Sequence, residues 1–232
     1  MYDRRYGMSP DDRKGSAQVR VRRSDLSTYA RIRNAALEGF AENGVAGTSI
    51  RDVAAAAGVS PGLVQHHFGT KSRLRDAVDE FVVEVAIETF RDLVPGDGEE
   101  VWAAMGATTT DWVRDNAVAL RYVARSLTEG DDGAARTLDA LVTIARASWL
   151  EPLKRGGALD PEVDEQWAAL HVIVFNLATV LMEPAISAQL GAPFFSPEQL
   201  QRWNLATTQL YRRALTRPSP RRTRASARRS AG

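Results

Sequence analysis

The stretch Thr48–Lys71, TSIRDVAAAAGVSPGLVQHHFGTK, predicts two short helices separated by a tight turn. Hydroxyl residues at its start can cap a helix in which apolar side chains recur at the spacing of one buried face. Gly58 can end that helix in a left-handed conformation. A serine followed by Pro61 is a typical helix start, so a second helix is expected over residues 61–67. The sequence therefore predicts a helix-turn-helix unit.

The second helix of this unit has one apolar face and one open face. Val64 and Phe68 are expected to point inward. The opposite face is small at its N-terminal turn and polar without being acidic, which suits a DNA major groove. The outward residues are Pro61, Gly62, Leu63, Gln65 and His66.

Helices are also predicted on both sides of the helix-turn-helix. Before it, the apolar residues of 32–40 fall on one face, and Gly44 ends that helix. After it, residues 71–93 form a helix long enough to connect two domains. Lys71 and Arg73 occupy its first turn, where acids are usual because they complement the helix dipole. An external anion such as a DNA phosphate is therefore a reasonable partner.

A set of residues follows one family pattern in order, spacing and residue type across four predicted helices. The set is Ile32, Ala35, Ala36, Phe40, Glu42, Asn43, Gly44, Thr48 to Ala54, Ala57 to Ser60, Gly62, His67, Phe68, Lys71 and Leu74. With these residues the chain resembles the DNA-binding domain of the TetR-type (TetR/AcrR) bacterial transcriptional regulators.

The resemblance implies specific DNA contacts. Residues 61–63, Gln65 and His66 are expected to meet the major groove, where Gln65 can pair bidentately with adenine. Many family members have tyrosine in place of Gln65 and an aromatic residue in place of His66, so hydrogen bonds can replace an apolar contact to thymine here. The residues expected at phosphates are Thr48, Ser49, Arg51 and Lys71.

The amino-acid composition limits the classes of protein to which this chain can belong. The 232 residues carry a net charge of +1, 44% hydrophobic side chains and no cysteine, so a sizeable core is possible and disulfides are excluded. Arginine concentrates at both ends, and we predict a disordered basic arm over residues 1–26 and a disordered basic tail over residues 217–232. The alternative is an electrostatic role of these ends in DNA binding.

Membrane and enzyme classes are disfavoured. The longest nearly uncharged stretch, residues 167–182, is shorter than the ~20 residues of a membrane span. The N-terminal residues lack an apolar signal-peptide core, so we expect a cytoplasmic protein without membrane contact. The three histidines have no metal-ligand spacing, and no phosphate-binding loop or cysteine nucleophile exists. We expect no enzyme activity and no cofactor.

The chain after a predicted break at residues 95–98 is read as helical, with no alternation typical of strands. Helices are expected over residues 99–114, 116–128, 134–155, from 160 past 182, and from a capping box at Ser196 to Leu215. The predicted fold class is all-α. An N-terminal three-helix DNA-binding domain (residues 27–73) is joined through a connecting helix to a helical ligand-binding and dimerisation domain (residues 74–216).

The predicted helix from residue 160 carries apolar residues on more than one side, so it needs more than one partner. The last predicted helix has an apolar seam that is interrupted by Thr207. The resemblance implies that helices over about 161–190 and 197–215 pair with their copies in a second subunit, and a homodimer is expected. The broad face on the first of them contains Trp167, Leu170, Val174, Leu177, Ala178, Leu181 and Ala185.

A small-molecule effector is the second functional hypothesis. All five tryptophans lie in the predicted C-terminal domain, and aromatic walls with a few polar groups are typical of ligand pockets, although ordinary cores look similar. By analogy with the family, we expect a repressor that a small apolar or aromatic effector releases from DNA. The alternative is a regulator without an effector pocket. The candidate ligand residues are Trp102, Trp112, Tyr122, Trp149, His171, Phe175 and Asn176.

Overall fold

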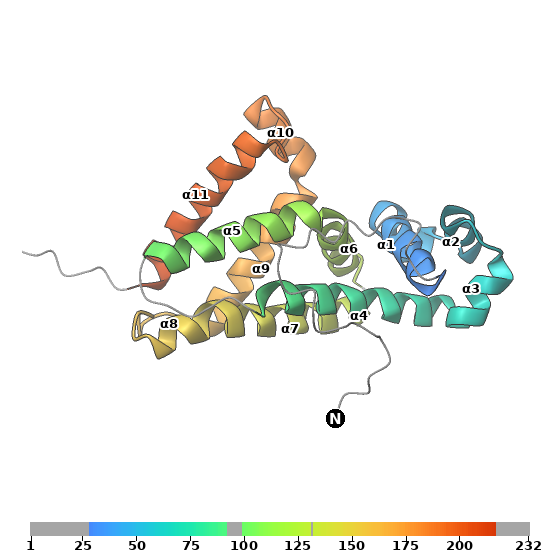
Figure 1. Cartoon of the computed structure of the whole chain (residues 1–232), viewed down its shortest axis with the longest axis horizontal. Coiled ribbons are helices and arrows are strands. Elements are labelled where there is room, and N and C mark those ends of the chain that lie inside the picture. Colours follow the sequence, from blue (N-terminus) through green and yellow to red (C-terminus); the bar gives the residue numbers. More distant parts are fainter. Residues whose placement is uncertain (1–27, 92–98, 131, 217–232) are drawn as a thin grey trace, which may run out of the picture.

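The computed structural model describes residues 28–91, 99–130 and 132–216, and these residues fold as the predicted all-α protein (Figure 1). The only strand-like pairing in these ranges is an isolated bridge between Leu159 and Thr216. The helices are α1 Thr28–Gly47, α2 Ile50–Ala57, α3 Pro61–Phe68, α4 Lys71–Phe90, α5 Glu99–Asp115, α6 Ala117–Thr128, α7 Asp132–Ala145, the π-helical turn η1 Arg146–Leu150, α8 Glu151–Arg155, α9 Glu165–Leu181, α10 Glu183–Leu190 and α11 Pro197–Leu215.

Helices α1, α2 and α3 gather at one end of the molecule, and α4 leads from them into the body beside α7 (Figure 1). The three N-terminal helices share a core in which Ile32, Phe40, Val53, Val64 and Phe68 are each at most 5% exposed. This core continues into the larger helical body without a break. The predicted domain boundary at residues 73 and 74 stays a prediction, and the predicted basic arm and tail lie outside the described residues.

The chain bends sharply where the first helix was expected to end. Gly44 has φ 74°, a left-handed conformation that favours glycine. A Cβ placed on Gly44 would lie 2.6 Å from Oε1 of Glu129 in the α6–α7 connection. The hydroxyl of Thr48 donates a shared hydrogen bond to the carbonyl oxygens of Gly39 and Gly44, each at 2.9 Å. The bend is therefore fixed by both backbone conformation and a buried hydroxyl.

Helix α1 is attached to the body at two places. Near its start, the Arg33 guanidinium lies 3.5 Å from the centroid of the Phe81 ring on α4. Near its end, Arg125 on α6 donates a hydrogen bond of 2.9 Å to the carbonyl oxygen of Glu42. The end of the molecule that contains α1, α2 and α3 thus rests on α4 and α6 together.

The helix predicted over residues 134–155 is interrupted by a π-helical turn. The segment begins at α7, passes through η1 and ends in α8. Pro152 has no N–H to donate and its ring crowds the preceding turn, so the ladder widens before it. The Glu151 N–H accordingly donates to the carbonyl oxygen of Arg146, five residues earlier.

The single helix predicted from residue 160 past 182 is wrong at both ends. The Asp164 carboxylate accepts hydrogen bonds from two backbone N–H groups at 3.0 Å and caps α9, so the helix begins at Glu165. At the other end the chain bends by 72° between α9 and α10. Pro184 cannot donate to the carbonyl oxygen one turn earlier and crowds it, which ends α9 at Leu181.

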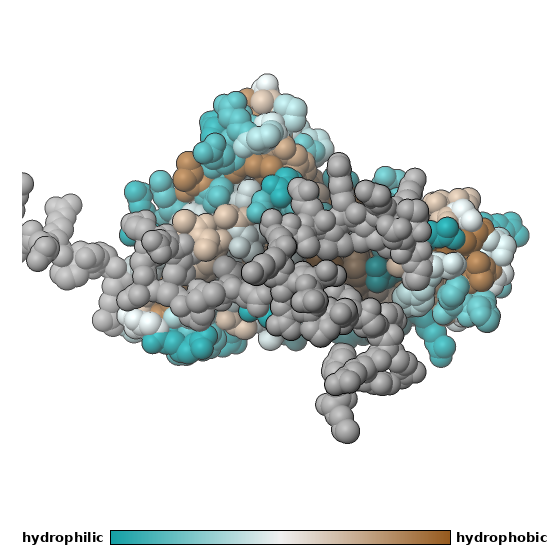
Figure 2. Space-filling view, viewed as in Figure 1, coloured by the Kyte–Doolittle hydropathy of each residue, from teal (hydrophilic) through white to brown (hydrophobic). Residues whose placement is uncertain are grey.

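Large apolar side chains remain exposed on the last helices, and Figure 2 shows hydrophobic surface on α10 and α11. No single helix of the described residues is long and apolar enough to cross a membrane, and the bent pair α9 and α10 meets that test only when both are counted together. The exposed apolar residues on α9 and α11 are Trp167, Val174, Phe175, Leu181, Leu205 and Leu210.

Candidate DNA interface and ligand cavity

Helix α3 is held from one side and open on the other. Its N-terminus is capped by Ser60, whose hydroxyl accepts a hydrogen bond of 3.2 Å from the Leu63 N–H. Val64 and Phe68 are buried, as predicted. The exposed face carries Pro61, Gly62, Gln65 and His66, and Leu63 is half-buried beside them. A fixed helix with hydrogen-bonding groups on its open face matches the requirements of a recognition helix.

The start of α2 carries a complete capping box. The Ser49 hydroxyl accepts from the Asp52 N–H at 3.2 Å, and the Asp52 carboxylate accepts from the Ser49 N–H at 2.8 Å. The hydrogen bonds from Ser49 lower the pKa of the Asp52 carboxyl. The Arg51 side chain between them is exposed. Phosphate contacts in this region are therefore open to Arg51, whereas the Ser49 hydroxyl already serves as a cap.

Lys71 lies close to the same region although it belongs to α4. Its ammonium donates a hydrogen bond of 3.3 Å to the carbonyl oxygen of Ala46, in the last turn of α1. Thr70 caps α4 by accepting from the Arg73 N–H at 3.2 Å, and the first turn of α4 has no acid. Lys71 and Arg73 thus lie in the first turn of α4, where the positive end of the helix dipole also favours an anion.

The expected phosphate contact of the Thr48 hydroxyl is corrected by the structure. Thr48 is only 3% exposed, and its hydroxyl is engaged with the carbonyl oxygens of Gly39 and Gly44. A side chain buried in this way holds the α1–α2 bend and does not reach a phosphate.

Sequence reasoning missed the aromatic support beneath the recognition helix. The Tyr29 ring stacks on Phe68, with 4.5 Å between centroids, and meets the His67 ring edge-on at 6.3 Å. These contacts join the start of α1 to the end of α3. Tyr29 precedes the first residue of the family pattern, so only its aromatic character could have signalled it.

Comparisons with known proteins agree with this geometry. Residues 32–78 match the family described as bacterial regulatory proteins, tetR family. The chain is 34% identical over 154 residues to the HTH-type transcriptional regulatory protein RaaS of Mycobacterium tuberculosis, covering 66% of this chain and 70% of RaaS. The chain belongs to the TetR family. It is a DNA-binding transcriptional regulator and not an enzyme.

Other TetR-family relatives match in part or in fold. The HTH-type transcriptional repressor Rv3405c of M. tuberculosis is 57% identical over 49 residues, which cover 21% of this chain and 26% of the repressor. The ketosteroid transcriptional regulator KstR2 of M. tuberculosis superposes with a TM-score of 0.60 at 18% identity, covering 83% of this chain and 96% of KstR2. The fatty acid degradation regulator FadR of Bacillus halodurans superposes with a TM-score of 0.63 at 16% identity, covering 80% and 95%. These superpositions show the fold.

A narrow internal cavity of about 20 Å³ lies among α4, α5, α7, η1 and α9. Trp112, Trp149 and Asn176, three of the predicted ligand residues, line it together. Sequence reasoning missed the remaining walls, which include Phe90, Thr109 and Ser148, because no local pattern distinguishes them from ordinary helix residues. None of the cavity-lining residues is ionisable. The full lining is Ala86, Phe90, Thr109, Trp112, Leu141, Ile144, Ala145, Ser148, Trp149, Val172, Ile173 and Asn176.

Polar atoms of the residues that line the cavity have no hydrogen-bond partner among the described residues. They are the Thr109 hydroxyl, the Trp112 indole N–H and the side-chain oxygen of Asn176, and each of these residues is at most 4% exposed. The Asn176 amide nitrogen is satisfied, because it donates to the Val172 carbonyl oxygen at 2.8 Å. An unsatisfied buried polar group costs roughly 1–3 kcal/mol, so these three atoms are unfavourable as long as they have no partner.

The other predicted ligand residues do not line this cavity. Trp102 lies behind Trp149, with 6.3 Å between the ring centroids. His171 and Phe175 are exposed on the opposite side of α9. Tyr122 is 1% exposed, and its hydroxyl donates to Asp79 on α4 at 2.6 Å. The interpretation of Tyr122 as a ligand residue is therefore corrected, because its hydroxyl joins α6 to α4.

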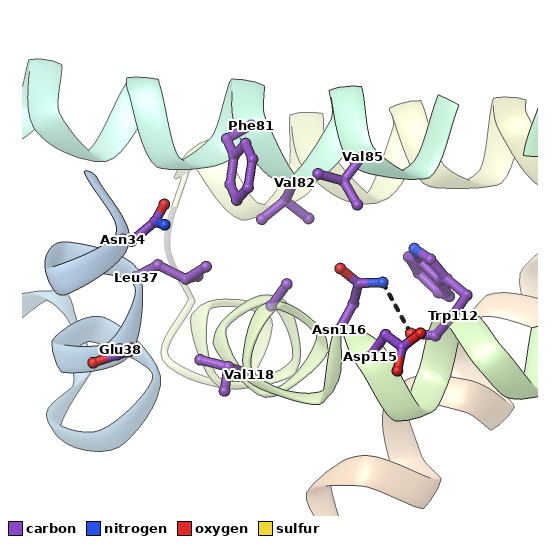
Figure 3. A pocket seen from close by; sticks show the side chains of 11 residues that line it. Asn34, Leu37, Glu38, Phe81, Val82, Val85, Trp112, Asp115, Asn116 and Val118 are labelled. Carbon is purple, nitrogen blue, oxygen red and sulfur yellow. Dashed lines mark hydrogen bonds between the residues drawn. The ribbon is translucent and has the colours of Figure 1, made fainter. Parts of the chain in front are cut away.

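A larger crevice of about 210 Å³ opens where α1, α4 and the α5–α6 junction meet (Figure 3). Leu37, Phe81 and Val85 form apolar walls, and the amides of Asn34 and Asn116 face the crevice from opposite ends. Trp112 also borders this crevice, so one indole ring lines both spaces. No group of three or more potential metal ligands occurs in the described part of the chain.

Proposed function

We propose that the protein is a homodimeric, sequence-specific repressor that a small apolar or aromatic effector releases from its operator in the cytoplasm. The observation that carries the proposal is the open face of α3, on which Gln65 and His66 are exposed while Val64 and Phe68 anchor the helix below. Gln65 would read a base edge, and His66 would add a second hydrogen-bonding group. Arg51 and Lys71 would neutralise phosphates on either side.

The apolar surface of α9 and α11 supports the homodimer. Trp167, Val174, Leu205 and Leu210 are all more than half exposed, and large apolar patches on a monomer are unusual away from interaction sites. A two-fold dimer buries the same patch on both subunits. Such a dimer would present two copies of α3, which must lie about 34–36 Å apart to enter successive major grooves.

Effector release would act through the helices that hold α1. The cavity is bordered by α4 through Ala86 and Phe90. The same helix carries Phe81, against which Arg33 of α1 is stacked. A guest that moves α4 would therefore move the DNA-binding end and change the separation of the recognition helices. Its effect is limited by the difference between its affinities for the two states, typically about 1–3 kcal/mol.

Fluorescence anisotropy tests the DNA assignment. The protein is titrated with DNA from around its own gene and with scrambled DNA of equal length, across a salt series. A preference for the native DNA that survives rising salt is expected. Gln65→Ala should weaken binding to the native DNA by about 1–3 kcal/mol and leave scrambled DNA unchanged. Gln189→Ala, an exposed glutamine on α10, is the matched control. Equal, steeply salt-dependent binding to both DNAs would overturn the assignment.

The small volume of the cavity favours a second candidate, a TetR-family regulator that acts without an effector. A space of about 20 Å³ holds little more than one water molecule. A screen for compounds that lower operator affinity separates the two candidates, and the ligand-independent regulator predicts that none of them does so.

A further inference from the structure

Trp112 lines two spaces of very different size. They are the inner cavity of about 20 Å³ and the open crevice of about 210 Å³. Within the described ranges, the Trp112 indole N–H has no hydrogen-bond partner. The Trp112 ring makes an edge-to-face contact with the Phe90 ring, with 5.5 Å between the centroids. Because no hydrogen bond fixes the indole, movement of this ring sacrifices no polar contact and would join the two spaces.

The polar atoms on the inner wall define what a guest must offer. The Trp112 indole N–H is a donor only, and the free oxygen of Asn176 is an acceptor only. The Thr109 hydroxyl can act in either sense. A guest that satisfies all of them carries an acceptor and a donor close together, as a carboxamide, a lactam or a phenol does.

The remaining walls exclude charge. The inner cavity is lined by apolar and uncharged polar side chains, and an ion buried there would have no counter-charge. The walls include the rings of Phe90, Trp112 and Trp149, which favour edge-on or offset contacts with another ring. The carboxylates of Glu38 and Asp115 line the crevice and disfavour an anion there. The walls of the two spaces therefore select an uncharged aromatic molecule over an anionic one.

The small size of the inner cavity requires that the crevice also contribute to the binding site. The inner cavity alone is too small for an aromatic ring, whereas the crevice is not. We infer that the crevice and the inner cavity are the two halves of one site for a neutral aromatic amide or phenol, with Trp112 as the movable partition between them. This inference rests on the proposed ligand response. It adds the chemical class of the effector and its route of access.

The position of the crevice gives the guest a direct contact with the DNA-binding end. Asn34 and Leu37 on α1 form one wall, and Phe81 and Val85 on α4 form another (Figure 3). A ring seated between them touches the helix that supports α2 and α3. The effector therefore acts on α1 without a relay through distant helices.

Benzamide is the test compound, with benzoate as its charged analogue and toluene as its apolar analogue. Each is titrated into the full chain labelled with ¹⁵N, and the indole N–H resonances of the five tryptophans are followed. Trp112→Phe assigns the Trp112 resonance. Benzamide is expected to shift that resonance and to bind at least about tenfold more tightly than benzoate or toluene, the factor expected for one hydrogen bond to a buried group.

Variants of the wall sharpen the test. Asn176→Leu and the near-isosteric Thr109→Val should each weaken benzamide binding by about tenfold. Trp203→Phe is the matched control, because its indole N–H also lacks a partner but lines neither space. The inference is overturned if the three compounds bind alike, if benzamide leaves the Trp112 resonance unmoved, or if both wall variants keep full affinity.

Operator affinity in the presence of bound benzamide separates this inference from the proposed function. If benzamide releases the protein from DNA, the result supports both the inferred site and the proposed ligand response. Benzamide that moves the Trp112 resonance while operator affinity stays constant supports the site and counts against the ligand response. An effector that releases DNA equally well from the wild type, Asn176→Leu and Thr109→Val supports the ligand response and overturns the site.

Discussion

The hydroxyl of Tyr122 on α6 donates a hydrogen bond of 2.6 Å to the carboxylate of Asp79 on α4. Burial, together with this carboxylate, raises the pKa of the Tyr122 hydroxyl, so the phenol stays protonated. The Tyr122 ring also lies 6.1 Å from the Phe40 ring on α1. The two helices that hold α1 are thus joined to each other beneath it.

Tyr122→Phe should destabilise the protein by about 1.5–3 kcal/mol, because it leaves a carboxylate that has lost a hydrogen bond. Urea unfolding followed by circular dichroism measures the change. Tyr211→Phe is the control, since its hydroxyl makes only a long contact of 3.4 Å to the His171 carbonyl oxygen, and it should cost less than about 1 kcal/mol. Equal losses in both variants would contradict the special role of the α4–α6 contact.

Thr48→Val should cost about 1–2 kcal/mol of stability, because two carbonyl oxygens lose a donor while the side-chain volume is kept. The salt dependence of DNA binding should not change. Lys71→Ala should instead reduce the slope of log affinity against log salt by about one and leave most of the stability intact. A reduced slope in Thr48→Val would restore this residue to the phosphate contacts.

Leu210→Glu should convert the dimer into a monomer at micromolar concentration, because the charge would be buried twice in a two-fold interface. Analytical ultracentrifugation reads the outcome. Ile87→Glu on α4 also replaces an exposed apolar residue and should leave the dimer intact. If the unmodified protein is monomeric under these conditions, the proposed two-fold geometry fails.

The capping box of α2 predicts a dependence on acid. The pKa of the Asp52 carboxyl is lower in the folded chain than in the unfolded chain. The ionised carboxylate therefore stabilises the fold above the unfolded pKa, and this stabilisation is lost as the pH falls through the folded pKa. The difference in unfolding free energy between the wild type and Asp52→Asn should therefore shrink from roughly pH 5 to pH 2. Ser49→Ala removes the hydroxyl but keeps the backbone N–H that donates to the Asp52 carboxylate, so in that background Asp52→Asn should keep only part of its effect. Additive effects of the two changes would contradict the shared cap.

Local signals made the fold predictable from sequence. Caps and breakers act within one turn, so Gly58 and Ser196 marked the end of α2 and the start of α11 correctly. Gly44, predicted to end the first helix, lies at a kink inside α1. Pro184 carried the same kind of signal, but the apolar spacing continued past it to Ala185 and favoured one long helix. Here the missing N–H outweighed the periodicity.

A site residue could be predicted from the sequence only where its own side chain indicates a function. Asn176 was singled out because an amide on an apolar helix needs a partner, and it lines the cavity. Thr109 on α5 and Phe90 on α4 carry no such signal, since their approach to Asn176 depends on how three helices pack. Tyr122 was misassigned for the same reason, because its partner Asp79 lies 43 positions away in sequence.

The double attachment of α1 has a mechanical consequence. Helix α1 is fixed by the contact of Arg33 with Phe81 and by the hydrogen bond from Arg125 to Glu42, so it does not rotate about either contact alone. When α4 and α6 shift together, α1 is translated with them and the direction of its axis does not change. A signal from the body would then reach the duplex as a change of spacing along its length, and the angle at which each α3 meets its groove would stay the same.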